Sequence, residues 1–161
     1  QYRDVLQDGR ADLAIGHLDF LKSGFHQQHL FDDSYCCVAS KRHPRFRDRI
    51  SLADFVAAQH VSVVSGNADG QVERELARLR LRRSISLQVT HYHTAVEVVA
   101  SSTLIATIPR QALKETKGIR AFAMPLNLQT ADVRQFWHRR MHHNPAHRWL
   151  RGLLFNLLGS A

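Results

Sequence analysis

The 161-residue sequence lacks several features that identify common classes of protein. It has no apolar run near the roughly 20 residues that a membrane-spanning helix needs, so we expect no membrane partner. Residues 1–4 do not resemble a signal peptide, and we predict a cytoplasmic chain that is not exported. Cysteine is scarce, and the only two, Cys36 and Cys37, are adjacent. On a strand they would point to opposite faces and not pair, which suits reduced thiols.

Sequence motifs of catalysis are also missing. There is no G-x-S-x-G elbow, no glycine-rich phosphate loop after a strand and no His-Glu-x-x-His pair. We therefore predict that the chain is not an enzyme and needs no cofactor. Eleven histidines include His91 with His93, and two pairs at four-residue spacing. Because no cysteine or carboxylate ligand lies at a fixed offset from these pairs, we expect no metal site.

Positive charge is abundant. The formal net charge of +8 and the pI near 10.3 favour an acidic partner, either nucleic acid or an anionic small molecule. The basic residues are spread over three groups, at residues 42–49, 78–83 and 139–151. A diffuse distribution is typical of a solubilising surface, so we expect no direct DNA contact by this chain. A nucleic-acid contact domain remains a third hypothesis, testable by the salt dependence of DNA affinity.

Strand and helix patterns alternate along the chain, which predicts an α/β fold with a mostly parallel sheet in its middle part. Caps support several helices: Ser51 with Asp54, Thr94 with Glu97 as a capping box, and Asn144 before Pro145. Strands are expected at residues 12–16, 29–40, 60–65, 84–90, 104–108, 119–126 and 133–138. Helices are expected at residues 1–8, after Ser51, after the turn at 66–70, from Thr94, from Pro109 to Gly118 and after Asn144.

The first lobe has too few elements for a sheet of its own. We therefore predict two Rossmann-like lobes joined by two crossover strands, with lobe I at residues 1–38 plus 123–161 and lobe II at residues 39–122. Two crossings would form a hinge and a cleft that closes on a ligand. Because the first helix has no preceding strand, we interpret the chain as N-terminally truncated.

Several motifs occur in an order and spacing that resemble the effector-binding domain of LysR-type transcriptional regulators. They are Gly9 to Gly16, Leu30-Phe31 followed by Tyr35 and His43-Pro44, Ile50 to Asp54, Leu104 to Pro109, Phe136 to Arg139, Pro145-Ala146 and Trp149 to Arg151. Gly24-Phe25, the Leu30-Phe31 strand and Phe136 to His138 are most similar to the branch that senses aromatic compounds such as salicylate, naphthalene-pathway metabolites and flavonoids.

The resemblance implies a periplasmic-binding-protein-like (type 2) pair of lobes, with a small-molecule inducer in the cleft and assembly into a homodimer or homotetramer. It also implies a winged helix-turn-helix that binds DNA and is absent from this chain. Carried over position by position, the effector contacts fall at strand ends and helix starts. They are Asp33, Gly66, Asn67, Asp69, Thr90, Pro109 and Gln111. Such positions offer unpaired N–H groups that favour an anion.

Three of these positions depart from the pattern of the aromatic-acid sensors. Gln111 stands where an arginine is frequent, and Asp33 and Asp69 stand where histidines occur. Two carboxylates would repel a carboxylate ligand unless they are neutralised, so a hydroxylated, neutral or cationic effector stays open beside a benzoate-type one. Asp69 could instead be a helix cap, Asn67 a turn residue and Asp33 a surface partner of an arginine such as Arg42.

Two functions of different classes remain open. The first is the effector-sensing domain of a DNA-binding transcription regulator, in which lobe closure is transmitted through the oligomer. The alternative is a free-standing periplasmic-type solute-binding protein. A helix-turn-helix and linker helix upstream would favour the first, and a secretion signal would favour the second.

Overall fold

The computed structural model describes residues 2–18, 21, 23–64, 67–113 and 117–159. Its contacts divide the chain into two compact units, the first made of Gln1–Asp33 with Ala131–Ala161 and the second of Ser34–Thr130. The chain thus passes from one unit to the other twice. Among the helices of these described ranges, none is long and apolar enough to cross a membrane.

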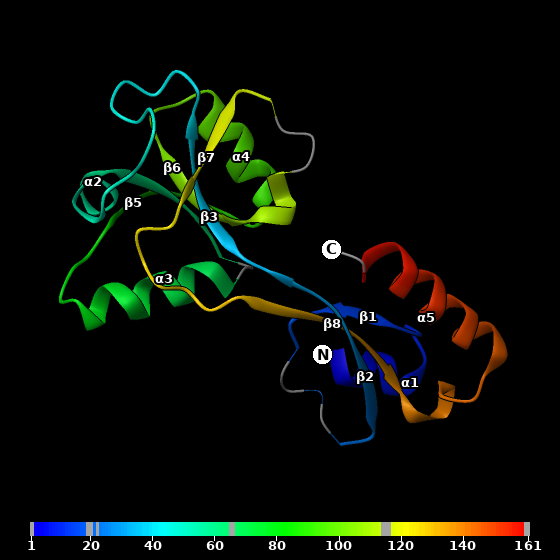
Figure 1. Ribbon diagram of the computed structural model, residues 1–161. Coiled ribbons are helices and arrows are strands. Elements are labelled where there is room, and N and C mark those ends of the chain that lie inside the picture. Colours follow the sequence, from blue (N-terminus) through cyan, green and yellow to red (C-terminus); the bar gives the residue numbers. More distant parts are fainter. Residues whose placement is uncertain (1, 19–20, 22, 65–66, 114–116, 160–161) are drawn as a thin grey trace. The chain divides into compact units, whose positions relative to one another are not determined.

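The first unit contains a three-stranded antiparallel sheet in the order β1-β8-β2 (Figure 1). The returning strand β8 is therefore central, pairing with β1 on one side and β2 on the other. The elements of this unit are α1 (Tyr2–Asp8), β1 (Ala14–Gly16), β2 (Phe25–Asp33), β8 (Ala131–His138), the 3-10 helix η2 (Arg139–Met141) and α5 (Pro145–Leu158).

One face of the first sheet is covered by apolar side chains, and the other is contacted by α5, whose buried side chains are polar. Leu6 of α1, Leu21 and Phe136 form the buried cluster on the first face. The buried residues of α5 are His147 and Arg151, and the Arg151 guanidinium lies 4.4 Å from the centre of the Trp137 ring. The apolar stripe of α5 that the sequence shows is partly exposed, since 68% of Trp149 is accessible.

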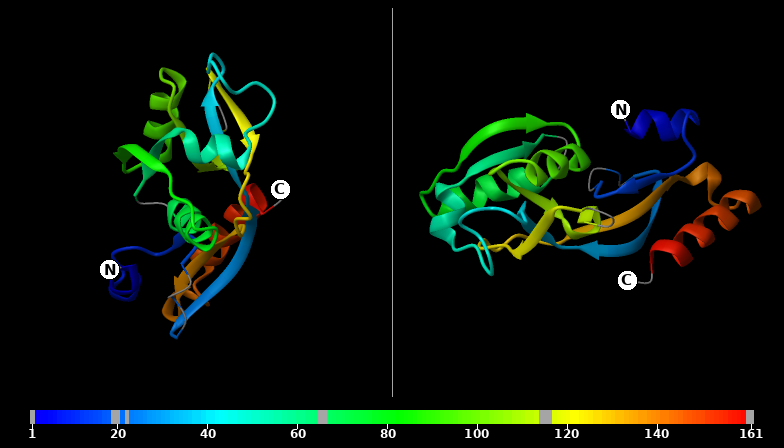
Figure 2. Two further views of the ribbon diagram at one scale, coloured as in Figure 1. Left: turned by 90° about the vertical axis from the view of Figure 1, so that its left-hand side faces the viewer. Right: turned by 90° about the horizontal axis from the view of Figure 1, so that it is seen from above.

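The second unit contains a five-stranded mixed sheet in the order β5-β4-β6-β3-β7 (Figures 1 and 2). Strands β5, β4 and β6 are parallel, and β3 is antiparallel to both β6 and β7. The elements of this unit are β3 (Tyr35–Ser40), α2 (Leu52–Ala57), β4 (Gln59–Val63), α3 (Asn67–Arg78), β5 (Ser84–Val89), α4 (Tyr92–Ala100), β6 (Ile105–Pro109), the 3-10 helix η1 (Arg110–Leu113) and β7 (Ile119–Ala123).

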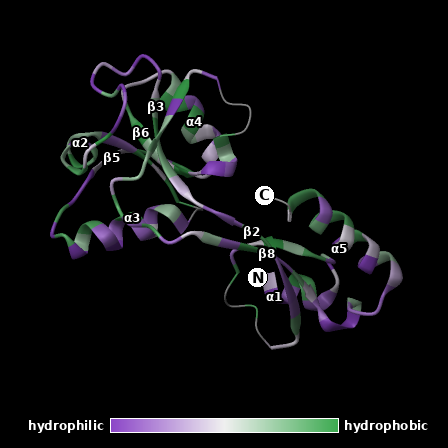
Figure 3. Cartoon of the chain, viewed as in Figure 1, coloured by the Kyte–Doolittle hydropathy of each residue, from purple (hydrophilic) through white to green (hydrophobic). Residues whose placement is uncertain are grey.

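Strand β3 is buried along its whole length and carries side chains into two hydrophobic clusters. Cys37 packs in the cluster that holds Phe55 and Leu76, whereas Cys36 packs in the cluster that holds Val96. The prediction that the two cysteines point to opposite faces is therefore confirmed. Helix α3 exposes a polar side, and Figure 3 shows it mostly in hydrophilic colours.

Two predicted helix starts are confirmed by their caps. The Ser51 side chain accepts a hydrogen bond from the Asp54 amide, and the Asn144 side chain accepts one from the His147 amide. A third was wrong, because Thr94 lies inside α4 and the N-cap residue is His91. Tyr92, the first residue of α4, packs against the cluster that contains Val96 and Val99, so the helix begins two residues before the polar signal.

Two further expectations differ from the structure in position. Pro109 ends strand β6, and a 3-10 helix over Arg110–Leu113 follows where a helix to Gly118 was predicted. The unit boundaries fall at 33/34 and 130/131, whereas the sequence placed them at 38/39 and 122/123. The reason is hydrogen bonding, because Cys36–Ser40 pairs with Ile119–Ala123 inside the second sheet.

Candidate functional site

The candidate site lies at one edge of the five-stranded sheet. Strands β4, β5 and β6 are parallel and end at Val63, Val89 and Pro109, so their carboxyl ends meet at this edge. Strand β3 runs the opposite way and begins there, with Tyr35 paired to Pro109. In open α/β sheets, ligands bind beside the carboxyl ends of parallel strands.

Four of the predicted effector contacts are brought together at this edge. Asn67 is the first residue of α3 and is exposed, and Thr90 directly follows β5 and is also exposed. Pro109 ends β6 and Gln111 lies in the 3-10 helix that follows it, both half-buried. The four residues come from the segments that follow three different strands, and the shared strand direction places all of them at one end of the sheet.

Asp69 also lies at this edge, but its carboxylate is engaged within the protein. One oxygen, Oδ2, accepts hydrogen bonds from the Ser62 hydroxyl at 2.6 Å and from the Val63 amide at 2.5 Å. The other, Oδ1, pairs with the Arg83 guanidinium at 2.6 Å. These bonds tie the first turn of α3 to the end of β4 and balance the carboxylate charge.

Arg83 is a residue that the sequence analysis did not single out. Its side chain is fully buried and donates to Asp69, to Glu73 at 2.9 Å and, at 3.5 Å, to Nδ1 of His60. Burial, together with the nearby Arg83 charge, lowers the pKa of His60 to about 4. His60 is therefore neutral near pH 7, with Nε2–H donating to the Phe55 carbonyl at 2.7 Å. Local spacing could not reveal this network, because Arg83, His60 and the two carboxylates of α3 come from three different parts of the chain.

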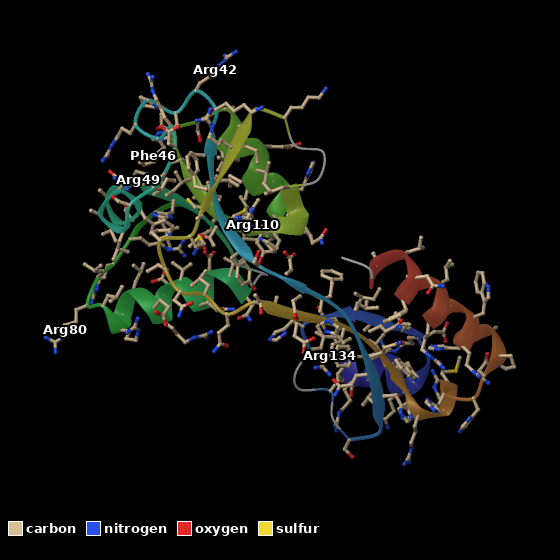
Figure 4. The ribbon with its side chains drawn as sticks, in the orientation of Figure 1. Arg42, Phe46, Arg49, Arg80, Arg110 and Arg134 are labelled. Atoms are coloured by element: carbon tan, nitrogen blue, oxygen red, sulfur yellow. The ribbon has the colours of Figure 1, made fainter. Side chains whose placement is uncertain are left out.

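Two neighbours of the predicted contacts belong to the same edge. His91 is the N-cap residue of α4, makes no side-chain cap bond, and has Nδ1 2.8 Å from the Thr90 hydroxyl. The amide N–H groups in the first turn of α4 are thus not satisfied by an N-cap side chain. Arg110 is exposed at the start of η1, and its amide donates to the Ser34 carbonyl at 2.8 Å (Figure 4).

Two predicted contacts are not part of this group. Asp33 is the last residue of the first unit, buried to 6% exposure and paired in register with Ala131. Gly66 lies outside the described residues. Their assignment to an effector site stays a prediction.

The LysR substrate binding domain, as a protein family, matches residues 1–158 of this chain. The chain belongs to this family. It is 35% identical over 157 residues to the HTH-type transcriptional activator NahR of Pseudomonas putida, covering 95% of this chain and 52% of NahR. A LysR domain senses an effector and is non-enzymatic, which confirms the expectation that this chain is not an enzyme.

Solved structures of a transcriptional regulator and of an effector binding domain share the two-sheet α/β fold. The probable transcriptional regulator PA0477 from Pseudomonas aeruginosa matches with a TM-score of 0.80 and 32% identity, over 94% of this chain and 51% of that one. The effector binding domain of QuiR, in complex with shikimate, has a TM-score of 0.77 at 14% identity, over 98% of this chain and 76% of that one. The predicted periplasmic-binding-protein-like α/β fold is thereby confirmed. This LysR chain spans about half the length of NahR.

Proposed function

We propose that this LysR domain binds a small, hydroxylated organic acid at the carboxyl edge of its five-stranded sheet. Asn67, Thr90, Pro109 and Gln111 would contact this effector. In the whole regulator, a separate DNA-binding part would respond to effector binding, in a cytoplasmic homodimer or homotetramer. The observation that carries the proposal is the convergence of these residues from three parallel strand ends.

An acid is favoured by the charges at this edge. Asp69 was one of the two carboxylates, with Asp33, expected to oppose an anion, and its charge is balanced by the buried Arg83. Helix α4 begins here without a side-chain cap, and helix N-termini favour negative charge. The exposed Arg110 adds a cation within the same loop as Gln111.

Hydroxyl groups on the effector would suit the short polar side chains. The Asn67 amide can donate and accept, and the Thr90 hydroxyl can do the same, whereas neither carries a charge. The half-buried ring of Pro109 offers an apolar surface against which an aromatic or alicyclic ring would lie. The complex of QuiR with shikimate, a hydroxylated cyclic acid, has this type of ligand on a related fold.

A thermal-shift panel tests the proposal. This chain is screened with hydroxylated aromatic and alicyclic acids, the matching phenols and alcohols without the carboxylate, and amines. We expect acids to raise the melting temperature, because a ligand that binds only the folded state stabilises it. A panel in which amines stabilise the chain and acids do not would contradict the assigned charge preference.

The site itself is tested with two matched variants. Replacing Asn67, Thr90 and Gln111 together by alanine is expected to abolish the shift. The control replaces Gln59 and Ser84, exposed residues at the opposite ends of β4 and β5, and should keep it. If the effector still raises the melting temperature of the triple variant but no longer raises that of the control variant, the site lies elsewhere.

A further inference from the structure

Strands β2 and β8 of the first unit carry a cluster of polar side chains next to the point where both strands leave that unit. His29 and Asp32 come from β2, and Asp132 comes from β8. One ligand atom of each of the three lies within 4.8 Å of those of the other two. His29 and Asp132 are 103 residues apart in sequence, so local spacing could not reveal this cluster.

A bulge in β2 is the reason that these side chains meet. His29 pairs with Arg134 and Phe31 pairs with Val133, so Leu30 is one extra residue in the ladder. Residues three apart on a regular strand point to opposite faces, but the bulge turns His29 and Asp32 to the same face. Asp132 lies opposite Asp32 in register and completes the group on that face.

We propose that His29, Asp32 and Asp132 bind a divalent first-row transition ion, represented here by Zn²⁺. One imidazole nitrogen and two carboxylate oxygens form a ligand set that suits Zn²⁺, and three protein ligands leave a position for water. Mg²⁺ and Ca²⁺ prefer oxygen ligands alone and would be disfavoured by the imidazole. The proposal departs from the sequence expectation of no metal site and does not depend on the effector site.

The distances are close to those that an ion requires. His29 Nδ1 lies 2.9 Å from Asp132 Oδ1. Two ligand bonds of about 2.1 Å at a tetrahedral angle separate their atoms by about 3.4 Å, so the exposed side chains need only small rotations. Asp32 is exposed, and among the described residues its side chain has no hydrogen bond or ion pair to give up.

Arg134 orients the shared carboxylate. The Nε and Nη2 of Arg134, which is labelled in Figure 4, lie 2.7 and 2.6 Å from Oδ2 of Asp132. This leaves Oδ1 to face His29. These hydrogen bonds lower the pKa of Asp132 and keep it ionised. A second residue that holds a ligand carboxylate in this way is a usual feature of metal sites. The next pair in the ladder, Asp33 with Ala131, is the last one before the chain enters the other unit.

Zn²⁺ titration of this chain by calorimetry tests the site. We expect one Zn²⁺ to bind per chain and to raise the melting temperature, and Mg²⁺ at the same concentration to have no effect. His29→Ala and Asp32→Asn should each weaken Zn²⁺ binding by at least about tenfold, since losing a residue that only orients a ligand costs about 10- to 100-fold. Both side chains are exposed, so circular dichroism should report unchanged folding.

Controls are needed because the chain has eleven histidines. His93→Ala removes an exposed histidine that pairs with Glu97 at 3.2 Å, and His142→Ala removes one that stacks on His26. Neither control should change the tightest Zn²⁺ binding. The proposal is overturned if that binding survives His29→Ala and Asp32→Asn, if it falls with either control, or if Mg²⁺ binds equally well.

Discussion

The buried guanidinium of Arg83 pairs with the Asp69 carboxylate at 2.6 Å, and this ion pair connects the start of α3 to the start of β5 in the second unit. The same guanidinium donates to Glu73 and faces His60. Arg83 thus holds together three side chains from two other elements. Removing one partner of a buried ion pair leaves the other charge buried and uncompensated. Substitutions in this network should therefore lower the free energy of unfolding strongly.

We predict that Arg83→Met destabilises the chain by about 3 to 5 kcal/mol, because it leaves the Asp69 carboxylate without its buried partner. Arg78→Met is the matched control, since Arg78 pairs with Glu75 at 3.0 Å while 67% of its side chain is exposed. An exposed pair contributes about 1 kcal/mol or less. Urea denaturation measures both free energies of unfolding, and equal losses would show that the network has no special weight.

The stability of the chain should depend on pH through His60. Burial lowers the folded-state pKa of this group from 6.5 to about 4, so the unfolded chain binds a proton more readily between these values. The stabilisation is complete above about pH 6.5 and is lost as the pH falls towards 4, with a total near 3 kcal/mol from about 1.4 kcal/mol per pKa unit.

The variant His60→Gln provides the comparison for this pH dependence. A glutamine amide can still donate to the Phe55 carbonyl but does not titrate in this range. The free energy of unfolding of this variant should therefore fall less steeply between pH 6.5 and 4 than that of the parent chain. Parallel curves for the two proteins would assign the acid sensitivity to other groups.

The sequence predicted the parts of the fold that depend on local patterns. Alternating strand and helix signals indicated the parallel sheet, and Ser51 and Asn144 marked two helix starts correctly. The four predicted effector contacts at the sheet edge, including Asn67 and Thr90, came from the resemblance to the LysR family, and the structure brings them to one edge because parallel strands end on the same side. The alternation of strands and helices in the sequence predicted this strand direction, but it did not identify the site residues.

The features that could not be predicted from the sequence depend on contacts between residues far apart in the chain. Asp69 lies at the predicted edge, but its bonds to Ser62 and Arg83 join residues from separate elements. The proximity of His29, Asp32 and Asp132 depends on a bulge at Leu30 and on a partner strand distant in the chain. Neither a bulge nor a cross-strand register leaves a periodic signal in one sequence.

Helix capping offers a direct comparison between a confirmed and a wrong prediction. Asn144→Ala should lower the free energy of unfolding by about 1 kcal/mol, because it removes the side-chain acceptor for the His147 amide at the start of α5. Thr94→Ala should leave stability unchanged or raise it slightly, because Thr94 lies inside α4, where alanine is the better helix former. A loss of similar size in Thr94→Ala would restore the predicted cap.

The two thiols should be unreactive in the folded chain. Cys36 and Cys37 are both fully buried, and burial raises the pKa of the Cys37 thiol far above its ordinary value. Because the thiolate is the reactive form, an aromatic disulfide reagent should label neither cysteine in native buffer and both after unfolding in urea. Rapid labelling of a single thiol without denaturant would show that β3 opens locally.

Ser40→Cys gives a matched comparison at the last residue of the same strand. The Ser40 side chain is also buried, but its hydroxyl donates to the Ala100 carbonyl at 3.2 Å. If the whole strand is protected, this third thiol should react as slowly as the other two, whereas faster reaction at position 40 alone would indicate fraying at the strand end.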